Sequence, residues 1–191
     1  MDRRKAIKRI LLLGGGGALS YGGFRTYKIF RTPDLGQLEE HQPLIDELAE
    51  VIIPATDTPG AKQAGVGEFI SRMVRHASVA QTQNKFIDGL QAIESLAKRR
   101  FGKSFISCTG DEKIMMVRHF ETKGKPVGGI MGKVERRLFG ESFFQTLKKY
   151  AVIGFCTSEQ GATRALAYDY IPGSYKGIVK MKPGQKSWAL Q

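Results

Sequence analysis

Cysteine and histidine are scarce in this sequence, and neither forms a cluster. The 191 residues include two cysteines, Cys108 and Cys156, and three histidines. Because there is no CxxC or CxxCH motif, covalent haem attachment, iron–sulfur ligation and a structural zinc site have no support. The two cysteines either form a disulfide in an oxidising compartment or remain free thiols. Cys156 lies in an apolar stretch and is interpreted as a core residue.

Recognisable catalytic motifs are also lacking. His41, His76 and His119 are scattered along predicted helices, and none accompanies a serine or cysteine in a nucleophile setting. No GxGxxG motif follows a predicted strand, and the glycine-rich segment 123–132 lacks the terminal Gly-Lys-Ser/Thr of a phosphate-binding loop. We therefore expect no catalytic, cofactor-binding or metal-binding residue on this chain, and an accessory or binding role.

Positive charge is concentrated at one end of the chain. The net charge is +12, and residues 1–31 contribute +7 of it through eight basic residues and one acidic residue. The other 160 residues carry 22 basic and 17 acidic residues, a net charge of only +5. A nucleic-acid-binding domain would need a basic face on the folded part of the chain, so we expect no nucleic acid as partner.

A leader for export is predicted over residues 1–31. A basic start is followed by an apolar stretch over residues 10–24, the order that is typical of a signal sequence. The twin-arginine pattern R-R-x-hydrophobic-hydrophobic-K is supplied by Arg3, Arg4, Ile7 and Lys8. As a helix, the apolar stretch would reach about 22 Å, short of the roughly 30 Å of a hydrocarbon core, so we do not interpret it as a membrane anchor. The alternative is a solvated basic tail.

Residues 32–191 are predicted to form one all-α domain, a compact bundle of about six helices joined by irregular loops. Apolar residues recur at helical spacing over 38–53, 66–78 and 82–100. Thr109 and Glu112 form a capping box that predicts the start of a further helix. A domain of this size buries roughly two-thirds of its unfolded surface, enough for a core without disulfide or metal.

The most apolar helical pattern lies in the last third of the chain. Its apolar residues are Phe143, Phe144, Leu147, Tyr150, Ala151, Ile153 and Gly154. We expect this helix to begin near Val134 and to be buried on most of its circumference. Thr157 and Gln160 have the spacing of a second capping box, which predicts a short helix that carries Ala162, Leu166 and Ala167 before the turn at Pro172-Gly173.

Four further residues are candidates for contact with a substrate or a partner. Asp57 lies in a loop rich in Asp, Thr, Pro and Gly, where a turn formed by its own side chain is favoured over cation binding. Tyr170 and Tyr175 flank the Pro-Gly turn, and packing of a loop is favoured over ligand binding. Trp188, in a basic tail, docks either on the core of the domain or on another protein.

Two long blocks resemble one known family. The segment LIDELAEVIIPATDTPGAKQAGVGEFISRMV at 44–74 is similar to the opening signature of the gluconate 2-dehydrogenase subunit 3 family. The segment FFQTLKKYAVIGFCTSEQGATRALAYDYIPGSYKG at 143–177 resembles its closing signature, and PGQKSWA in the tail fits as well. The resemblance extends over 38–189, with one departure at Phe155-Cys156, where two aromatic residues would be expected.

The resemblance implies a function as a subunit. Such a small subunit carries a twin-arginine leader, recognised by the twin-arginine translocase, and accompanies an FAD-bearing dehydrogenase subunit of the glucose–methanol–choline type. Electrons pass onward to a cytochrome c subunit. The resemblance thus implies a non-catalytic periplasmic subunit, associated with the inner membrane through its complex, which supplies the export signal and stabilises the catalytic subunit.

Two other hypotheses stay open. In the first, the subunit shapes the mouth of the partner's active site, and Asp57, Tyr170 or Tyr175 contacts the sugar or sugar acid. In the second, the chain is a stand-alone exported helical protein that binds or interacts without a dehydrogenase partner.

Overall fold

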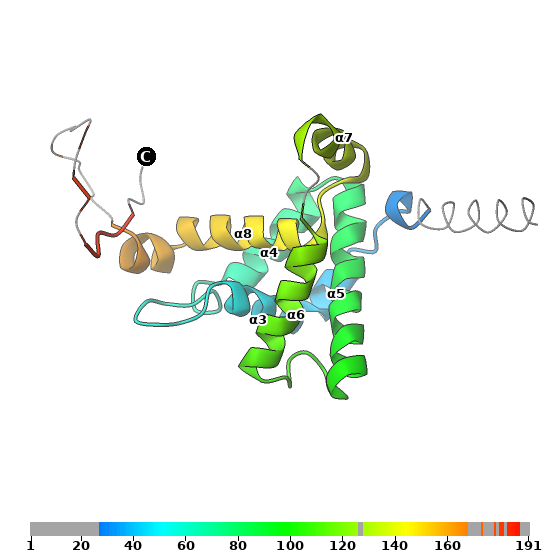
Figure 1. The fold of residues 1–191 in the computed structure, drawn as a ribbon, viewed down its shortest axis with the longest axis horizontal. Coiled ribbons are helices and arrows are strands. Elements are labelled where there is room, and N and C mark those ends of the chain that lie inside the picture. Colours follow the sequence, from blue (N-terminus) through cyan, green and yellow to red (C-terminus); the bar gives the residue numbers. More distant parts are fainter. Residues whose placement is uncertain are drawn as a thin grey trace, which may run out of the picture.

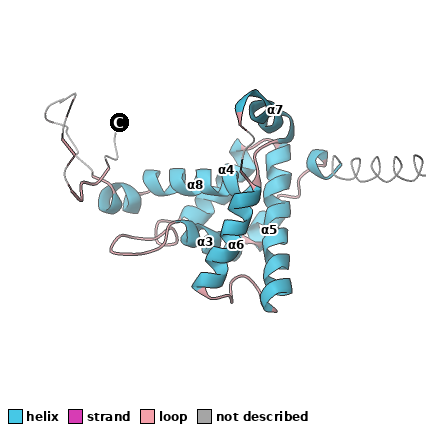
Figure 2. Ribbon diagram, in the orientation of Figure 1, coloured by secondary structure: helices cyan, strands magenta, loops and turns pink. Residues whose placement is uncertain are grey.

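The predicted all-α fold is confirmed. The computed structural model describes residues 27–125, 128–167, 173, 178, 180, 181 and 183–187. Over these residues the chain forms helices α2 to α8 and a π-helical turn, η1, and contains no strand (Figure 2). None of the helices in this part of the chain has the length and apolar character needed to cross a membrane.

The first predicted helix is divided in two. α2 (Gly36–Glu40) ends at His41, and α3 (Gln42–Ile52) begins at the next residue. The His41 ring lies 2.8 Å from the carbonyl oxygen of Gln37, measured from Nδ1. Pro43 lies in the first turn of α3, where the missing N–H costs no helical hydrogen bond. The buried residues of α3 are Leu44, Ile45, Leu48 and Ala49.

The next three helices follow the predicted pattern closely. They are α4 (Val66–Ala77), α5 (Ala80–Phe101) and α6 (Gly110–Lys123). The predicted capping box at the start of α6 is present, since the Thr109 hydroxyl accepts from the Glu112 N–H and the Glu112 carboxylate accepts from the Thr109 N–H. α5 ends at Gly102, whose φ of 70° is a left-handed conformation that glycine adopts without strain.

α8 (Phe143–Thr157) is the central helix of the bundle. It packs against α3, α4, α5, α6 and η1, and crosses the molecule between them (Figure 1). Of the predicted apolar residues, all but Ile153 are buried, whereas Ile153 is 40% exposed. Cys156 is also exposed, so its interpretation as a core residue is wrong. Cys108 is buried instead, and both thiols are free.

The predicted start of this helix near Val134 is wrong, because Gly140 interrupts it. α7 (Gly129–Phe139) ends at Gly140, which has a φ of 75°, and α8 begins after Ser142. The Glu141 N–H donates to the Thr82 hydroxyl on α5 at 3.0 Å, and the Ser142 hydroxyl accepts from the Gln145 N–H at the start of α8. The hydrogen bond to Thr82 on α5 therefore helps to fix the break between α7 and α8.

The second predicted capping box is not formed. Ser158, rather than Thr157, caps the next turn, since its hydroxyl accepts from the Gly161 N–H at 3.0 Å. The Thr157 hydroxyl instead donates to the Ile153 carbonyl within α8. The helical segment that follows is the short π-helical turn η1 (Gly161–Ala165), which contains Ala162 but ends before Leu166 and Ala167, the other two residues predicted for this helix.

The last residues of the predicted leader are bound to α5. The buried Asn84 side chain donates to the carbonyl oxygens of Ile29 and Arg31, at 3.0 and 2.6 Å. Arg31 also forms an ion pair with Asp88 on α5 at 2.8 Å. The leader signal residues Arg3, Arg4, Ile7 and Lys8 lie outside the described residues.

Candidate functional site

Asp57 is the one predicted contact residue within the described part of the chain. It is exposed in the loop between α3 and α4, and it makes no hydrogen bond with another described residue there. The turn is instead closed by the Thr58 carbonyl, which accepts from the Thr56 N–H at 3.0 Å, so the predicted Asp57 turn is wrong. Tyr170, Tyr175 and Trp188 lie outside the described residues.

Glu50 orders the base of this loop. Its carboxylate accepts from the Ala55 N–H at 3.0 Å and from the Lys62 N–H at 2.8 Å, and these two residues lie on opposite arms of the loop. The role of Glu50 was not predicted from the sequence. An acidic residue on the polar face of a helix gives no sign that its carboxylate will accept hydrogen bonds from backbone N–H groups of a loop. Asp57 is thus carried at the exposed end of a loop with a fixed base.

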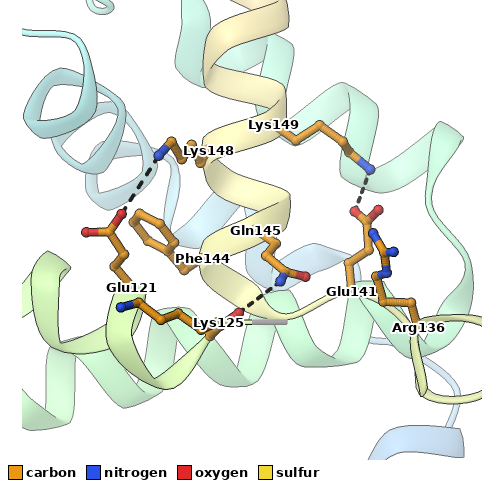
Figure 3. A pocket seen from close by; sticks show the side chains of 9 residues that line it. Glu121, Lys125, Arg136, Glu141, Phe144, Gln145, Lys148 and Lys149 are labelled. Atoms are coloured by element: carbon orange, nitrogen blue, oxygen red, sulfur yellow. Dashed lines mark hydrogen bonds and ion pairs between the residues drawn. The ribbon is translucent and has the colours of Figure 1, made fainter. Parts of the chain in front are cut away.

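A cavity of about 470 Å³ lies where α6, the segment after it, α7 and α8 meet. Its lining residues are Glu121, Gly124, Lys125, Arg136, Glu141, Phe144, Gln145, Lys148 and Lys149 (Figure 3). The Gln145 side-chain amide donates to the Gly124 carbonyl at 2.9 Å and so joins α8 to the end of α6. Phe144 supplies the aromatic surface of the cavity, and Lys148 Nζ lies 5.9 Å from the centre of its ring.

The cavity is basic. Its lining includes four cations and two carboxylates, a net charge of +2. Lys148 pairs with Glu121 at 3.8 Å and Lys149 pairs with Glu141, whereas Arg136 and Lys125 form no ion pair with any described residue. Four cations beside the Phe144 ring suit the binding of an anionic group next to an aromatic surface.

α7 presents an apolar face to solvent beside this cavity. Its apolar residues are exposed: Ile130 to 80%, Met131 to 72%, Val134 to 45% and Leu138 to 53%. The only buried residue of α7 is Gly132. α7 lies at the edge of the molecule, beyond one end of α5, and packs extensively against no other described helix (Figure 1).

The ionisable groups with shifted pKa values lie elsewhere and serve the fold. Burial opposes ionisation of Glu47, but hydrogen bonds and charge from Lys62 and Lys113 outweigh it and lower the pKa of this carboxyl. The Lys113–Glu47 distance is 3.0 Å, and the pair links α6 to α3. Burial raises the pKa of the Cys108 thiol, and the nearby Glu112 carboxylate adds to that effect.

Candidate metal ligands do not gather in the described part of the chain, where no group of three or more His, Cys, Asp or Glu side chains is placed to hold an ion. The three histidines are separate: His41 lies between α2 and α3, His76 is exposed on α4, and His119 is exposed on α6.

The comparisons with known proteins gave one match. The family described as gluconate 2-dehydrogenase subunit 3 matches residues 39–173. This range contains α3 to α8, η1, the Asp57 loop and the basic cavity. No curated protein and no solved structure matches the chain.

Proposed function

This chain belongs to the gluconate 2-dehydrogenase subunit 3 family, and from that membership we propose that it is the non-catalytic small subunit of a flavin-dependent sugar or sugar-acid dehydrogenase. The match over residues 39–173 is the observation that carries the proposal, since it extends over α3 to α8 and η1. In this proposal FAD and the catalytic residues belong to a large flavoprotein subunit of the glucose–methanol–choline type, and a cytochrome c subunit accepts the electrons.

The proposed physical role is escort and stabilisation. The twin-arginine route carries proteins that are already folded, so a large subunit without a leader can cross the membrane while bound to a small subunit that has one. Arg3, Arg4, Ile7 and Lys8 would supply the signal, and the complex would work in the periplasm, associated with the inner membrane. A binding partner also stabilises the folded state of the protein it binds, by mass action.

An export experiment tests the proposal. Arg3→Lys with Arg4→Lys keeps the charge of the leader but removes the arginine pair, and we expect periplasmic dehydrogenase activity to fall by at least about tenfold while the complex accumulates in the cytoplasm. Arg9→Lys is the matched control, because it makes the same change outside the pair. Unchanged export in the double variant would contradict the escort role.

Purification of the tagged chain tests the subunit role separately. We expect a large protein with flavin absorbance and sugar or sugar-acid dehydrogenase activity to co-elute with it. If the chain elutes alone from cells that contain the dehydrogenase, the stand-alone binding protein is the better description.

A further inference from the structure

We infer that the outward face of α7 is the surface on which the dehydrogenase subunit docks, and that this partner presents an apolar patch with an acidic border. The inference rests on the proposed function and adds the place and the chemistry of the contact. The face is defined here as Ile130, Met131, Val134 and Leu138, and it is called the α7 face below.

The orientation of α7 is the first argument. At 3.6 residues per turn, the four residues of the α7 face fall within roughly 100° of the helix circumference, the width of an ordinary core-facing stripe. Gly132, the one buried residue of α7, lies on the opposite side. A helix in a bundle normally turns its apolar stripe toward the core, whereas α7 turns this stripe away from the body of the protein.

Further exposed aromatic residues lie at the end of α7. Phe139, at the end of α7, is 38% exposed and meets Phe30 edge to face, with ring centres 6.4 Å apart. Phe30 is 53% exposed and the nearby Tyr27 is 68% exposed. Contiguous exposed apolar residues of this kind mark sites of interaction in soluble proteins. The Phe30–Phe139 contact therefore joins the end of α7 to residues 27–30, at the end of the predicted leader.

The border of the α7 face indicates the charge of its partner. Lys133 and Arg137 lie along one edge of the face and form no ion pair with any described residue. Arg136 lies on the side of α7 that faces the body of the protein, where it lines the basic cavity. Cations without carboxylate partners around an apolar centre fit a partner surface that has an apolar centre and acidic residues around it. Complementary charge of this kind guides association and fixes orientation.

The same border disfavours two other occupants. An anionic bilayer is met by helices with basic residues along the polar border, whereas Glu135 follows the other edge of the α7 face. In an antiparallel symmetric pair of copies, Lys133 and Arg137 of one α7 helix would lie along Lys133 and Arg137 of the other, so like charges would face each other. A chemically different, acidic protein surface is the better fit.

The test uses the full chain co-expressed with the dehydrogenase. Val134→Gln with Leu138→Gln removes the apolar centre while keeping good helix formers. Ile114→Gln with Met115→Gln on α6 is the matched control, since these residues are 41% and 42% exposed on another helix. We expect the α7 variant to bind the dehydrogenase at least about tenfold more weakly, and the α6 variant to bind as wild type does.

A charge-reversal variant tests the border. Lys133→Glu with Arg137→Glu should slow association and remove most of its dependence on ionic strength, whereas Arg72→Glu with Arg118→Glu, on other helices, should leave both unchanged. Circular dichroism of each variant chain checks that helix content is retained.

The outcomes separate the inference from the proposed function. If the wild-type chain fails to bind a dehydrogenase, the proposed function fails. If the wild-type chain binds and the Val134/Leu138 variant binds equally well, the inference about the α7 face is wrong. It is also wrong if that variant loses only flotation with phosphatidylglycerol vesicles, or only a self-association seen by sedimentation, while its dehydrogenase affinity is unchanged.

Discussion

Gly89 of α5 lies directly against the ring of Phe143 at the start of α8. A Cβ atom placed on Gly89 would come within 2.2 Å of Cγ of Phe143, far inside van der Waals contact. Phe143 also packs against Phe86 and Phe120, with ring centres 5.4 and 5.6 Å apart. The absence of a side chain at Gly89 is what lets α5 and α8 approach around this aromatic cluster.

Gly89→Ala should destabilise the fold by about 1–3 kcal/mol, the usual cost of overpacking a core. Helix propensity alone would favour alanine by about 0.5–1 kcal/mol, so a net loss shows that the ring contact dominates. Gly110→Ala, at an open position in the first turn of α6, is the control and should be neutral or stabilising. Urea unfolding measures both, and equal stabilisation of the two variants would contradict the contact.

Glu47→Gln should weaken the acid dependence of stability. Because Lys62 and Lys113 lower the pKa of Glu47 below its ordinary value of 4.5, this carboxylate stabilises the fold fully above that value and progressively less as the pH falls through the lowered pKa. We expect the variant to be about 1 kcal/mol less stable at neutral pH, with the difference shrinking in acid. Unfolding curves at several pH values measure the difference, and a constant difference would contradict the assignment.

Cys156 should react with a maleimide at least about tenfold faster than Cys108. Cys156 is exposed, whereas burial shields the Cys108 thiol and raises its pKa, which leaves less of the reactive thiolate. Labelling of the native chain should stop at one thiol, disappear in Cys156→Ser and persist in Cys108→Ser. No labelling before reduction would instead indicate a disulfide.

Asp57→Ala should leave the free energy of unfolding within about 0.5 kcal/mol of wild type, since the side chain is exposed and unpaired within the described residues. Glu50→Ala is the informative comparison, because it removes the carboxylate that holds Ala55 and Lys62 and should destabilise the loop. In the assembled complex we expect kcat/KM to be unchanged by Asp57→Ala. A changed kcat/KM with full assembly would place this loop at the mouth of the partner's active site.

Local signals in the sequence predicted the elements that depend on local contacts. The capping box of Thr109 and Glu112 is complete within four residues, so it could be identified without knowledge of the fold. The end of α7 was missed because it depends on Thr82, which lies on α5 and accepts from the Glu141 N–H. Gly140 within a helical pattern does not by itself show that the helix ends there, because the break also depends on a hydroxyl from another helix.

Of two features of the helix faces, one could be inferred from the sequence and the other could not. Lys149, Val152 and Cys156 recur at helical spacing on the exposed side of α8, and the lysine is a local sign that this side faces water. The exposure of Cys156 could therefore have been inferred. The exposure of the α7 face could not be inferred. An apolar stripe shows that one side of a helix is buried, but it does not show whether the same chain or another protein buries it.

The hydrogen bonds from Asn84 to the carbonyl groups of Ile29 and Arg31 determine where a force on the N-terminal end of the chain enters the bundle. Any tension on the residues before 27 reaches α5 through the two carbonyl groups held by Asn84 and the Arg31–Asp88 ion pair, before it reaches α2 or α3. α5 is the longest described helix, with 22 residues, and it packs against α8. A pull on this end of the chain would thus load α5 and its packing against α8 before the shorter helices α2 and α3.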